Sequence, residues 1–286
     1  MRAAASPPEA PVAAVLAAHI DAGGLDWIVP DWPAPATVGA LSTTRHGGVS
    51  TGAAASMNLG IKGALRGNDD TADVVARNRR RLDPFLPSPP IWLDQVHGTG
   101  VAVLDAGNAA GLRSGPPVAD AAVTRERGLV CAVLTADCLP VLFADRRGRA
   151  VGAAHAGWRG LAAGVLAATV AALDALGAPP GDLCAWLGPA IGPRAFEVGR
   201  DVRDTFVGDD PGAADCFVPH GTTKWHADLY GLARRRLAAA GVGVVRGGGL
   251  CTMSDAARFH SYRRDRTSAR MATLVWLAPA AADPTL

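Results

Sequence analysis

The sequence lacks any apolar run long enough to cross a membrane. Within its 286 residues, no stretch approaches the roughly 18 consecutive apolar residues that a membrane-spanning helix requires. It also lacks an excess of charge of either sign, because 28 basic and 26 acidic side chains leave a formal net charge of only +2. Neither nucleic acid nor a membrane is therefore an expected partner. We expect a cytoplasmic globular protein that is a monomer or a weak homo-oligomer.

Lysine and cysteine are both scarce. Lys62 and Lys224 are the only lysines, so nearly all basic side chains are arginines. The guanidinium fork of arginine suits oxyanions better than an ammonium group does, although a biased base composition of the gene would give the same result. The five cysteines are odd in number and widely spaced, which is typical of a reduced, cytosolic protein rather than of a disulfide framework.

Proline interrupts the alanine-rich start of the chain. The stretch "SPPEAP" breaks the apolar character before a signal-type segment can form. Residues 1–24 are therefore predicted to be a flexible arm that leads to a short helix, and residues 281–286 are predicted to be a disordered tail. Because the chain shows no repeat, low-complexity linker or change in composition, we expect one domain over residues 25–280.

The predicted strands come in groups, and the predicted helices do not alternate with them regularly. This order favours an α+β fold with mixed sheets over a doubly wound parallel sheet. The clearest helix is predicted over residues 158–177, where apolar residues recur on one stripe and Gly177 marks the end. A second amphipathic helix is predicted after Asp228, and a final strand precedes the C-terminal tail.

Three side chains that can bind a metal each lie at a turn where a strand is expected to end. They are His97 in "DQVHGTG", Cys138 in "TADCLP" and His155 in "AHAGWRG". Each of them alone is most often a core residue. Together, two histidines and a cysteine form a donor set for Zn²⁺ that leaves one coordination position open, as in catalytic zinc sites. Their spacing is too long to identify a metal site without further evidence.

Two other uses of these residues remain open at this point. Cys138 is also a candidate nucleophile whose thiolate is activated by His155, as in cysteine hydrolases, with His97 as a bystander. A third possibility is a metal-stabilised binding protein, which predicts a zinc site closed by a fourth protein ligand. Cys251 and His260 are the candidates for that fourth ligand.

Several arginines and acidic residues are candidates for anion binding, for orienting a metal ligand or for acid–base catalysis at such a site. Arg159 is expected in the first turn of the clearest helix, where backbone N–H groups favour an anion. Arg45 lies in the glycine-rich "TTRHGGVS" loop, and Arg263 lies in "SYRRD". Asp120 and Asp137 are candidates for orienting a metal ligand or for acid–base work, although both residue types also commonly cap turns.

The chain resembles the YfiH-like family, also called the laccase-domain or multicopper polyphenol oxidase family, some members of which are called peptidoglycan editing factors. The resemblance covers roughly residues 38 to 278. Its blocks are, in order, "TTRHGGVS", "MNLG", "DQVHG", "ADAAVT", "TADCLPVLFAD", "AHAGWRG", "LGPAIGPRAFEVG", "DLYGLARRRL" and "FHSYRRDRTSARMA". The resemblance implies a layered α/β/β/α sandwich with mixed β-sheets.

The resemblance also implies a site and an activity. In that family the residues that correspond to His97, Cys138 and His155 hold zinc. The implied reactions are phosphorolysis of adenosine, inosine or methylthioadenosine and hydrolytic deamination of adenosine. For the substrate and phosphate, the candidate residues are Arg45, Arg159 and Asn58 of the "MNLG" block. The sequence departs from the family pattern at "FHSYRRD", where "FFSYRRD" is commoner, and at "RTSAR", where "TGR" is usual.

Two further activities are weighed against this one. Laccase chemistry is not expected, because multicopper oxidases need about ten histidines and this chain has seven. The alternative enzyme is a Cys–His hydrolase that removes a wrongly installed amino acid from a UDP-muramoyl peptidoglycan precursor. Since that substrate carries a diphosphate, the arginines do not distinguish between the hydrolase and the phosphorylase.

Overall fold

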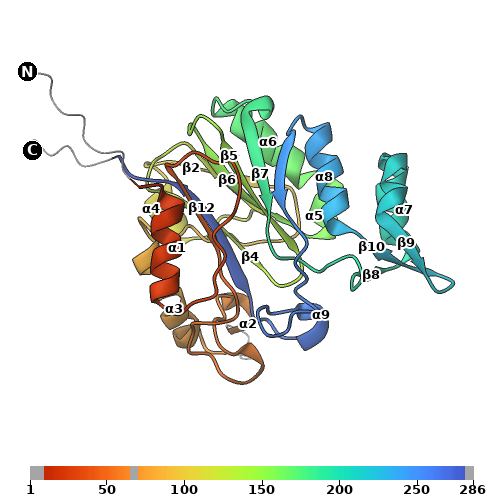
Figure 1. The fold of residues 1–286 in the computed structure, drawn as a ribbon, viewed down its shortest axis with the longest axis horizontal. Coiled ribbons are helices and arrows are strands. Elements are labelled where there is room, and N and C mark those ends of the chain that lie inside the picture. Colours follow the sequence, from red (N-terminus) through yellow and green to blue (C-terminus); the bar gives the residue numbers. More distant parts are fainter. Residues whose placement is uncertain (1–9, 65–69, 281–286) are drawn as a thin grey trace, which may run out of the picture.

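Two β-sheets packed face to face lie at the centre of the structure, and helices cover their outer faces (Figure 1). The structure is a computed structural model that describes residues 10–64 and 70–280. The first nine residues of the predicted arm and the predicted tail at 281–286 lie outside the described residues.

The larger sheet has six strands in the order β11-β7-β5-β6-β3-β2. It is mixed, because β11 pairs with β7 and β2 pairs with β3 in parallel, whereas the neighbours in between are antiparallel. In chain order, its strands are β2 (Val101–Leu104), β3 (Ala121–Thr124), β5 (Leu139–Asp145), β6 (Val151–Ala156), β7 (Leu183–Leu187) and β11 (Val244–Gly247).

The second sheet is antiparallel and has the order β1-β12-β4. Its strands are β1 (Val38–Ser42), β4 (Val130–Thr135) and β12 (Met271–Leu277). The predicted final strand is therefore β12, the middle strand of this sheet. Outside these strands, Ile91 forms an isolated parallel bridge to Cys131 of β4.

Alternating side chains of the central strands fill two separate cores. In β5, Val141 and Phe143 face the helices, whereas Leu142 and Ala144 face the second sheet. Successive residues of a strand point to opposite faces, so a strand covered on both sides is apolar throughout. Every residue of β5 is accordingly buried.

Helices complete the sandwich on both sides. One face of the larger sheet is covered by α5 (Trp158–Ala163), α6 (Val165–Ala175) and α8 (Leu229–Ala239), as Figure 1 shows. The outer face of the second sheet is covered by α1 (Val12–Ala22), which contributes Leu16 and Ile20 to a third core. The α/β/β/α sandwich implied by the resemblance is confirmed.

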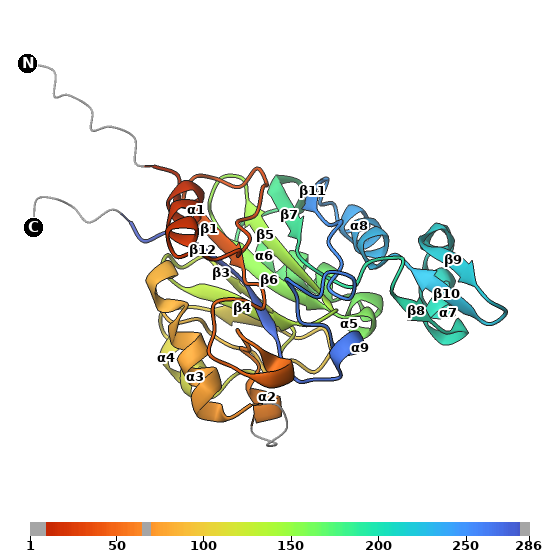
Figure 2. The same ribbon diagram turned by 60° about the horizontal axis from the view of Figure 1, so that its bottom comes forward.

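The remaining elements are short or peripheral. The small sheet β8-β10-β9 and helix α7 lie together at one end of the molecule, at the right of Figure 2. Their bounds are β8 (Glu197–Val198), α7 (Arg200–Asp209), β9 (Phe217–His220) and β10 (Lys224–Ala227). The other α-helices are α2 (Ile61–Ala64), α3 (Ala72–Arg80), α4 (Ala109–Ser114) and α9 (Tyr262–Asp265), and single 3₁₀ segments lie at Gly52–Ala54, Asp83–Phe85, Pro180–Asp182 and Pro211–Cys216.

One sequence-based expectation needs correction. The helix predicted over residues 158–177 is two helices, because Gly164 adopts φ 100°, a left-handed conformation that ends α5 before α6 begins. The predicted short N-terminal helix is α1, and its buried side chains Leu16 and Ile20 belong to the third core.

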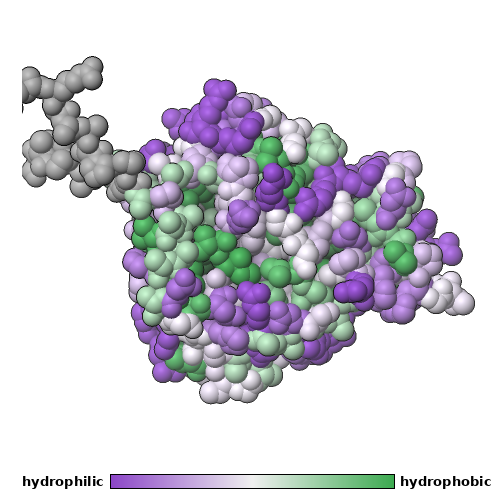
Figure 3. Space-filling model, viewed as in Figure 1, coloured by the Kyte–Doolittle hydropathy of each residue, from purple (hydrophilic) through white to green (hydrophobic). Residues whose placement is uncertain are grey.

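The described helices also bear on membrane association. None of those in residues 10–64 and 70–280 combines the length and the apolar character that a bilayer span demands. On the face shown in Figure 3, hydrophilic residues spread over much of the surface, with smaller groups of hydrophobic residues between them.

We predict that Gly39→Ala destabilises the fold. A Cβ atom at position 39 would lie 2.2 Å from the Trp276 ring on the neighbouring strand, and that indole is 2% exposed. The ring has no room to move away, so the free energy of unfolding should fall by about 2 kcal/mol. Denaturant unfolding measures this change. The control Gly181→Ala meets no atom within 4 Å and should be nearly neutral; equal stability of the two variants would contradict the prediction.

Candidate active site

The three predicted metal ligands converge at one place in the fold. His97 lies in the loop before β2, Cys138 in the turn between β4 and β5, and His155 in β6. Because β6 pairs with β5 with His155 opposite Pro140, the antiparallel register brings the second histidine beside the cysteine turn. One ligand atom from each side chain lies within 4.8 Å of the others. We call these three residues the ligand cluster.

Asp120 positions both histidines. Its carboxylate accepts hydrogen bonds from the backbone N–H groups of Val96, His97 and Gly98, at 3.2, 2.9 and 2.6 Å. Oδ1 of Asp120 also lies 2.8 Å from Nδ1 of His155. This bond places the proton of the imidazole on Nδ1 and leaves Nε2 for a metal. The side chain of Asp120 is fully buried, so the same carboxylate fixes a loop and a strand.

The charge on Asp120 is maintained by those contacts. Burial by itself raises the pKa of its carboxyl. The hydrogen bonds from His155 and from the backbone of Gly98 lower the pKa by more than burial raises it, so the net pKa lies below the ordinary value. A buried carboxylate with several N–H donors is stable in its ionised form. Asp120 therefore accepts hydrogen bonds as an anion at neutral pH.

Asp137 fixes the turn that carries Cys138. Its φ of 88° lies in the left-handed region, which is rare for a residue with a side chain. The carboxylate accepts a 2.6 Å hydrogen bond from the Thr252 hydroxyl and another 2.6 Å bond from the backbone N–H of Arg263. The carbonyl of Asp137 accepts from the N–H of Ile191 at 2.9 Å. These bonds offset the cost of the unusual backbone conformation and hold the thiol in place.

Gly157 leaves room for the ligand cluster. A Cβ atom at this position would lie 2.9 Å from Sγ of Cys138 and 2.9 Å from Cδ2 of His97. Its φ of −62° is open to any residue, so the space alone demands glycine. The "HAGWRG" motif thus supplies the ligand His155 and, two residues later, a glycine whose lack of a side chain leaves space for the cluster.

The thiol of Cys138 is poised to ionise. Burial raises its pKa, but the charge and hydrogen bond of His155, together with His97, lower it to about 6. Sγ of Cys138 lies 3.8 Å from Nε2 of His97, and the two imidazole rings meet edge to face with centroids 4.8 Å apart. A thiolate between two imidazoles is the ionisation state in which these groups bind a divalent cation. The donor set fits zinc, which prefers nitrogen and sulfur ligands.

Within the part of the chain that the structure describes, no fourth His, Cys, Asp or Glu completes the ligand cluster. Cys251, one of the two candidates, instead accepts hydrogen bonds from the N–H groups of Gly192 and Ser254. His260, the other candidate, is fully buried elsewhere in the protein, and burial lowers its pKa to about 3. The donor set among the described residues is that of an open metal site.

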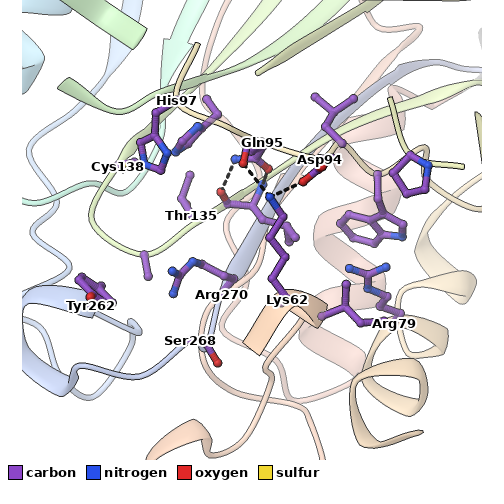
Figure 4. A pocket seen from close by; sticks show the side chains of 18 residues that line it. Lys62, Arg79, Asp94, Gln95, His97, Thr135, Cys138, Tyr262, Ser268 and Arg270 are labelled. Carbon is purple, nitrogen blue, oxygen red and sulfur yellow. Dashed lines mark hydrogen bonds and ion pairs between the residues drawn. The ribbon is translucent and has the colours of Figure 1, made fainter. Parts of the chain in front are cut away.

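Two cavities meet at the ligand cluster. The larger has a volume of about 700 Å³ and the smaller about 310 Å³. His97, Cys138 and Tyr262 line both. Figure 4 shows the larger cavity, with His97 and Cys138 at one end. A reacting atom at the cluster is therefore accessible from two sides, which suits a reaction between two substrates.

The smaller cavity contains two of the predicted arginines. Arg159 and Arg263 line it, and Arg266 joins them. The Arg159 guanidinium lies 4.5 Å from the centroid of the Trp158 ring. Because α5 has only six residues, a helix dipole adds little here, and the arginine side chains themselves supply the positive charge.

Two other predicted residues lie elsewhere. Arg45 lines neither cavity, since its guanidinium donates hydrogen bonds to the carbonyls of Ala55 and Ala256. Asn58 is fully buried and accepts hydrogen bonds from the N–H groups of Gly60 and Arg270, both of which line the larger cavity. Asn58 thus shapes a cavity wall, and Arg45 braces a loop.

Several residues of the site were missed in the sequence. Arg266 and Arg270 both follow "SYRRD" closely, so the density of arginines there was a usable signal. Arg79 and Trp92 line the larger cavity. Arg79 lies within "RNRRR" on the polar helix α3, where nothing in the sequence separates it from its exposed neighbours.

Comparison with known proteins supports the assignment of a family. The profile of the family described as multi-copper polyphenol oxidoreductase laccase matches residues 39–278. Purine nucleoside phosphorylase PA4543 of Pseudomonas aeruginosa is 54% identical over 252 residues, covering 88% of this chain and 98% of that protein. Purine nucleoside phosphorylase YfiH of Escherichia coli is 50% identical, covering 87% of this chain and 98% of its own.

Solved structures show the same fold. Protein NMB0706 of Neisseria meningitidis, a DUF152 protein, superposes with a TM-score of 0.81 at 49% identity, covering 89% of this chain and 100% of its own. YlmD of Geobacillus stearothermophilus gives a TM-score of 0.77 at 32% identity, covering 85% and 93%. The chain therefore belongs to the multi-copper polyphenol oxidoreductase laccase family, in which several of its relatives are named purine nucleoside phosphorylase.

Proposed function

We propose that the protein is a zinc-dependent purine nucleoside phosphorylase, acting on adenosine, inosine and methylthioadenosine, that also deaminates adenosine. The observation that carries this proposal is the ligand cluster, in which three side chains converge between two cavities without a fourth ligand among the described residues. The names of the relatives support the phosphorolysis. Deamination rests on the family resemblance and on the suitability of an open zinc site for hydrolysis.

The ligand cluster would hold the zinc through Nε2 of His155, Sγ of Cys138 and the His97 imidazole. Zinc in such a site supplies Lewis-acid chemistry and a lowered pKa for bound water. Asp120 keeps His155 in the tautomer and orientation that a ligand needs. The backbone bonds of Asp120 hold the loop of His97 at the same time.

The smaller cavity is assigned to phosphate. Arg159, Arg263 and Arg266 bring three guanidinium groups to a volume of about 310 Å³ beside the cluster. Among the described residues, no acidic side chain forms an ion pair with Arg159. Its charge is therefore available for a phosphate oxyanion. A phosphate held there stabilises the positive charge that develops on the ribose as the base departs.

The larger cavity is assigned to the nucleoside. Trp92, Leu93 and Leu134 give its wall an apolar character, and Tyr262 lies where the two cavities meet. A mostly apolar cleft with a few polar groups is the usual form of a small-molecule site. The ribose would then face the phosphate across the ligand cluster, as an in-line substitution at C1′ requires.

A cysteine hydrolase remains the second candidate, because of the lowered pKa of Cys138 beside two imidazoles. In that mechanism His155 would activate the thiol, and the substrate would be a UDP-muramoyl peptidoglycan precursor. A lowered thiol pKa is expected of a metal ligand and of a nucleophile alike. The experiments below separate the two.

We predict one zinc ion per chain in protein purified without added metal. His97→Ala and Cys138→Ala should lose the metal because each removes one of three ligands. Elemental analysis of the folded variants checks this. The control Cys251→Ala removes a thiol outside the cluster and should keep its zinc. Less than about half an equivalent of zinc in the wild type would contradict the site, and copper in its place would point back to the family name.

We predict that Arg159→Ala weakens the use of phosphate far more than the binding of nucleoside. Losing one charge-assisted contact should raise the barrier to phosphorolysis by about 2 to 4 kcal/mol. The measurement is the dependence of the rate on phosphate at saturating nucleoside. Arg159→Lys should recover part of the loss because it restores the charge. The control Arg125→Ala, on an exposed turn, should behave as wild type. An unchanged phosphate dependence in Arg159→Ala would assign Arg159 a structural role only.

The effect of His97→Ala distinguishes zinc chemistry from a cysteine nucleophile. A metal site needs His97, whereas a dyad of Cys138 and His155 works without it. We expect folded His97→Ala to lose both phosphorolysis and deamination, and wild type to lose them on chelation and regain them with zinc. Mass spectra of enzyme quenched during turnover should show unmodified Cys138. A covalent adduct there, or full activity of His97→Ala, would favour the hydrolase.

A further inference from the structure

The end of the larger cavity farthest from the ligand cluster is cationic. In Figure 4, Arg79 lies at the opposite end from His97 and Cys138, with the Lys62 side chain between them. Lys62, Arg79 and Arg270 all line this cavity, and Asp94 is its one acidic lining residue among those described. Phosphorolysis of a neutral nucleoside needs one anion site, which the smaller cavity already supplies. A second group of positive charges therefore requires its own explanation.

Arg79 carries the strongest evidence. Its Nε and one terminal nitrogen donate hydrogen bonds to the carbonyl of Leu59, at 3.1 and 2.9 Å, and its guanidinium lies 4.2 Å from the centroid of the Trp92 ring. No acidic side chain of the described residues pairs with it, and the other terminal nitrogen donates no hydrogen bond to them. Burial lowers the pKa of Arg79 only to about 10, so the group keeps its charge at neutral pH.

The acceptor that positions Arg79 is itself fixed. The N–H of Leu59 donates to the carbonyl of Arg270 at 2.9 Å, and the side chain of Asn78 donates to the carbonyl of Asn58 at 2.9 Å. Asn58 in turn accepts from the N–H of Gly60. The peptide segment beneath Arg79 is thus held from both sides, and the guanidinium is positioned in advance of any ligand. Such preorganisation reduces the entropy lost on binding.

Lys62 contributes less uncompensated positive charge to the cavity than Arg79 does. Its ammonium group pairs with Asp94, donates to the carbonyl of Gln95 at 2.9 Å and is 60% exposed. The charge of Lys62 is therefore already balanced within the cavity wall. A guanidinium held without a carboxylate in a largely apolar cavity is costly unless a ligand supplies the negative charge.

We infer that this far end of the larger cavity is a second anion subsite, and that purine nucleoside 5′-monophosphates bind with their phosphate at Arg79 and undergo phosphorolysis. The inference rests on the proposed function, since it places the ribose C1′ at the ligand cluster. The C1′–N9 bond breaks with its electron pair going to the base. An oxygen of inorganic phosphate forms the new bond to C1′ and loses its proton, which the base takes up. The sugar leaves as a ribose that carries phosphate at positions 1 and 5.

The test compares the binding of inosine and inosine 5′-monophosphate to the zinc-loaded protein by titration calorimetry, at low salt and without inorganic phosphate, so that neither ligand is consumed. The wild type should bind the monophosphate more tightly by roughly tenfold, the value of one charge-assisted contact. Arg79→Met should remove that preference and leave inosine binding within about twofold. Arg79→Lys, which keeps the charge, should retain part of the preference. Arg80→Met, on the exposed side of the same helix, is the matched control and should behave as wild type.

Three results would overturn the inference. One is a wild type that binds the monophosphate no more tightly than inosine. Another is an equal loss of affinity for both ligands in Arg79→Met, with no recovery in Arg79→Lys. That result would mean that Arg79 contacts the purine base or stabilises the fold. The last is a raised KM for inorganic phosphate in the Arg79 variants alone, which would place inorganic phosphate at this end. Phosphorolysis of adenosine by the wild type is measured separately, so an active enzyme without the monophosphate preference refutes the subsite and leaves the proposed function standing.

Discussion

The buried carboxylate of Asp120 is the constraint on which the site depends. A fully buried anion is unfavourable unless hydrogen-bond donors surround it, and three backbone N–H groups and one imidazole do so here. Because those donors belong to the loop of His97 and to His155, satisfying the charge places both histidines at once. The placement of the two histidines is therefore a consequence of neutralising one carboxylate, while the contacts of Asp137 place the thiol of Cys138.

The sandwich explains why this arrangement is rigid. Strands β5 and β6 are buried on both faces, so their register cannot shift without exposing a whole core. The turn at Asp137 and the glycine at position 157 sit at the ends of these strands, where backbone rather than side chains approaches the cluster. His155 lies in β6 and Cys138 in the turn that leads into β5, while the cavities are lined largely by the loops and short helices around them.

The sequence predicted the ligand cluster and the class of fold for physical reasons. Residue types with metal affinity are rare in apolar surroundings, so three of them at predicted strand ends stood out against their neighbours. The position of Arg45 outside both cavities could not be predicted, because a glycine-rich loop indicates backbone freedom and does not show where the guanidinium points. Arg79 was missed because its acceptor, the carbonyl of Leu59, is a tertiary contact. The break at Gly164 was missed because an isolated glycine within a helical pattern is often tolerated.

The distribution of charge ties the two cavities to one kind of chemistry. A divalent cation held by one thiolate and two neutral imidazoles keeps a single positive charge, and the Asp120 carboxylate behind His155 is already satisfied by its own donors. Arginines flank this centre on both sides, Arg159 in the smaller cavity and Arg79 in the larger. With a cation bound at the ligand cluster, positive potential would extend into both cavities, where apolar walls reduce its screening. Such a field would favour anions as ligands, as the proposed transfer of an oxyanion to a sugar requires. The arginine bias of the sequence, which proved nothing by itself, gains a local meaning at these positions.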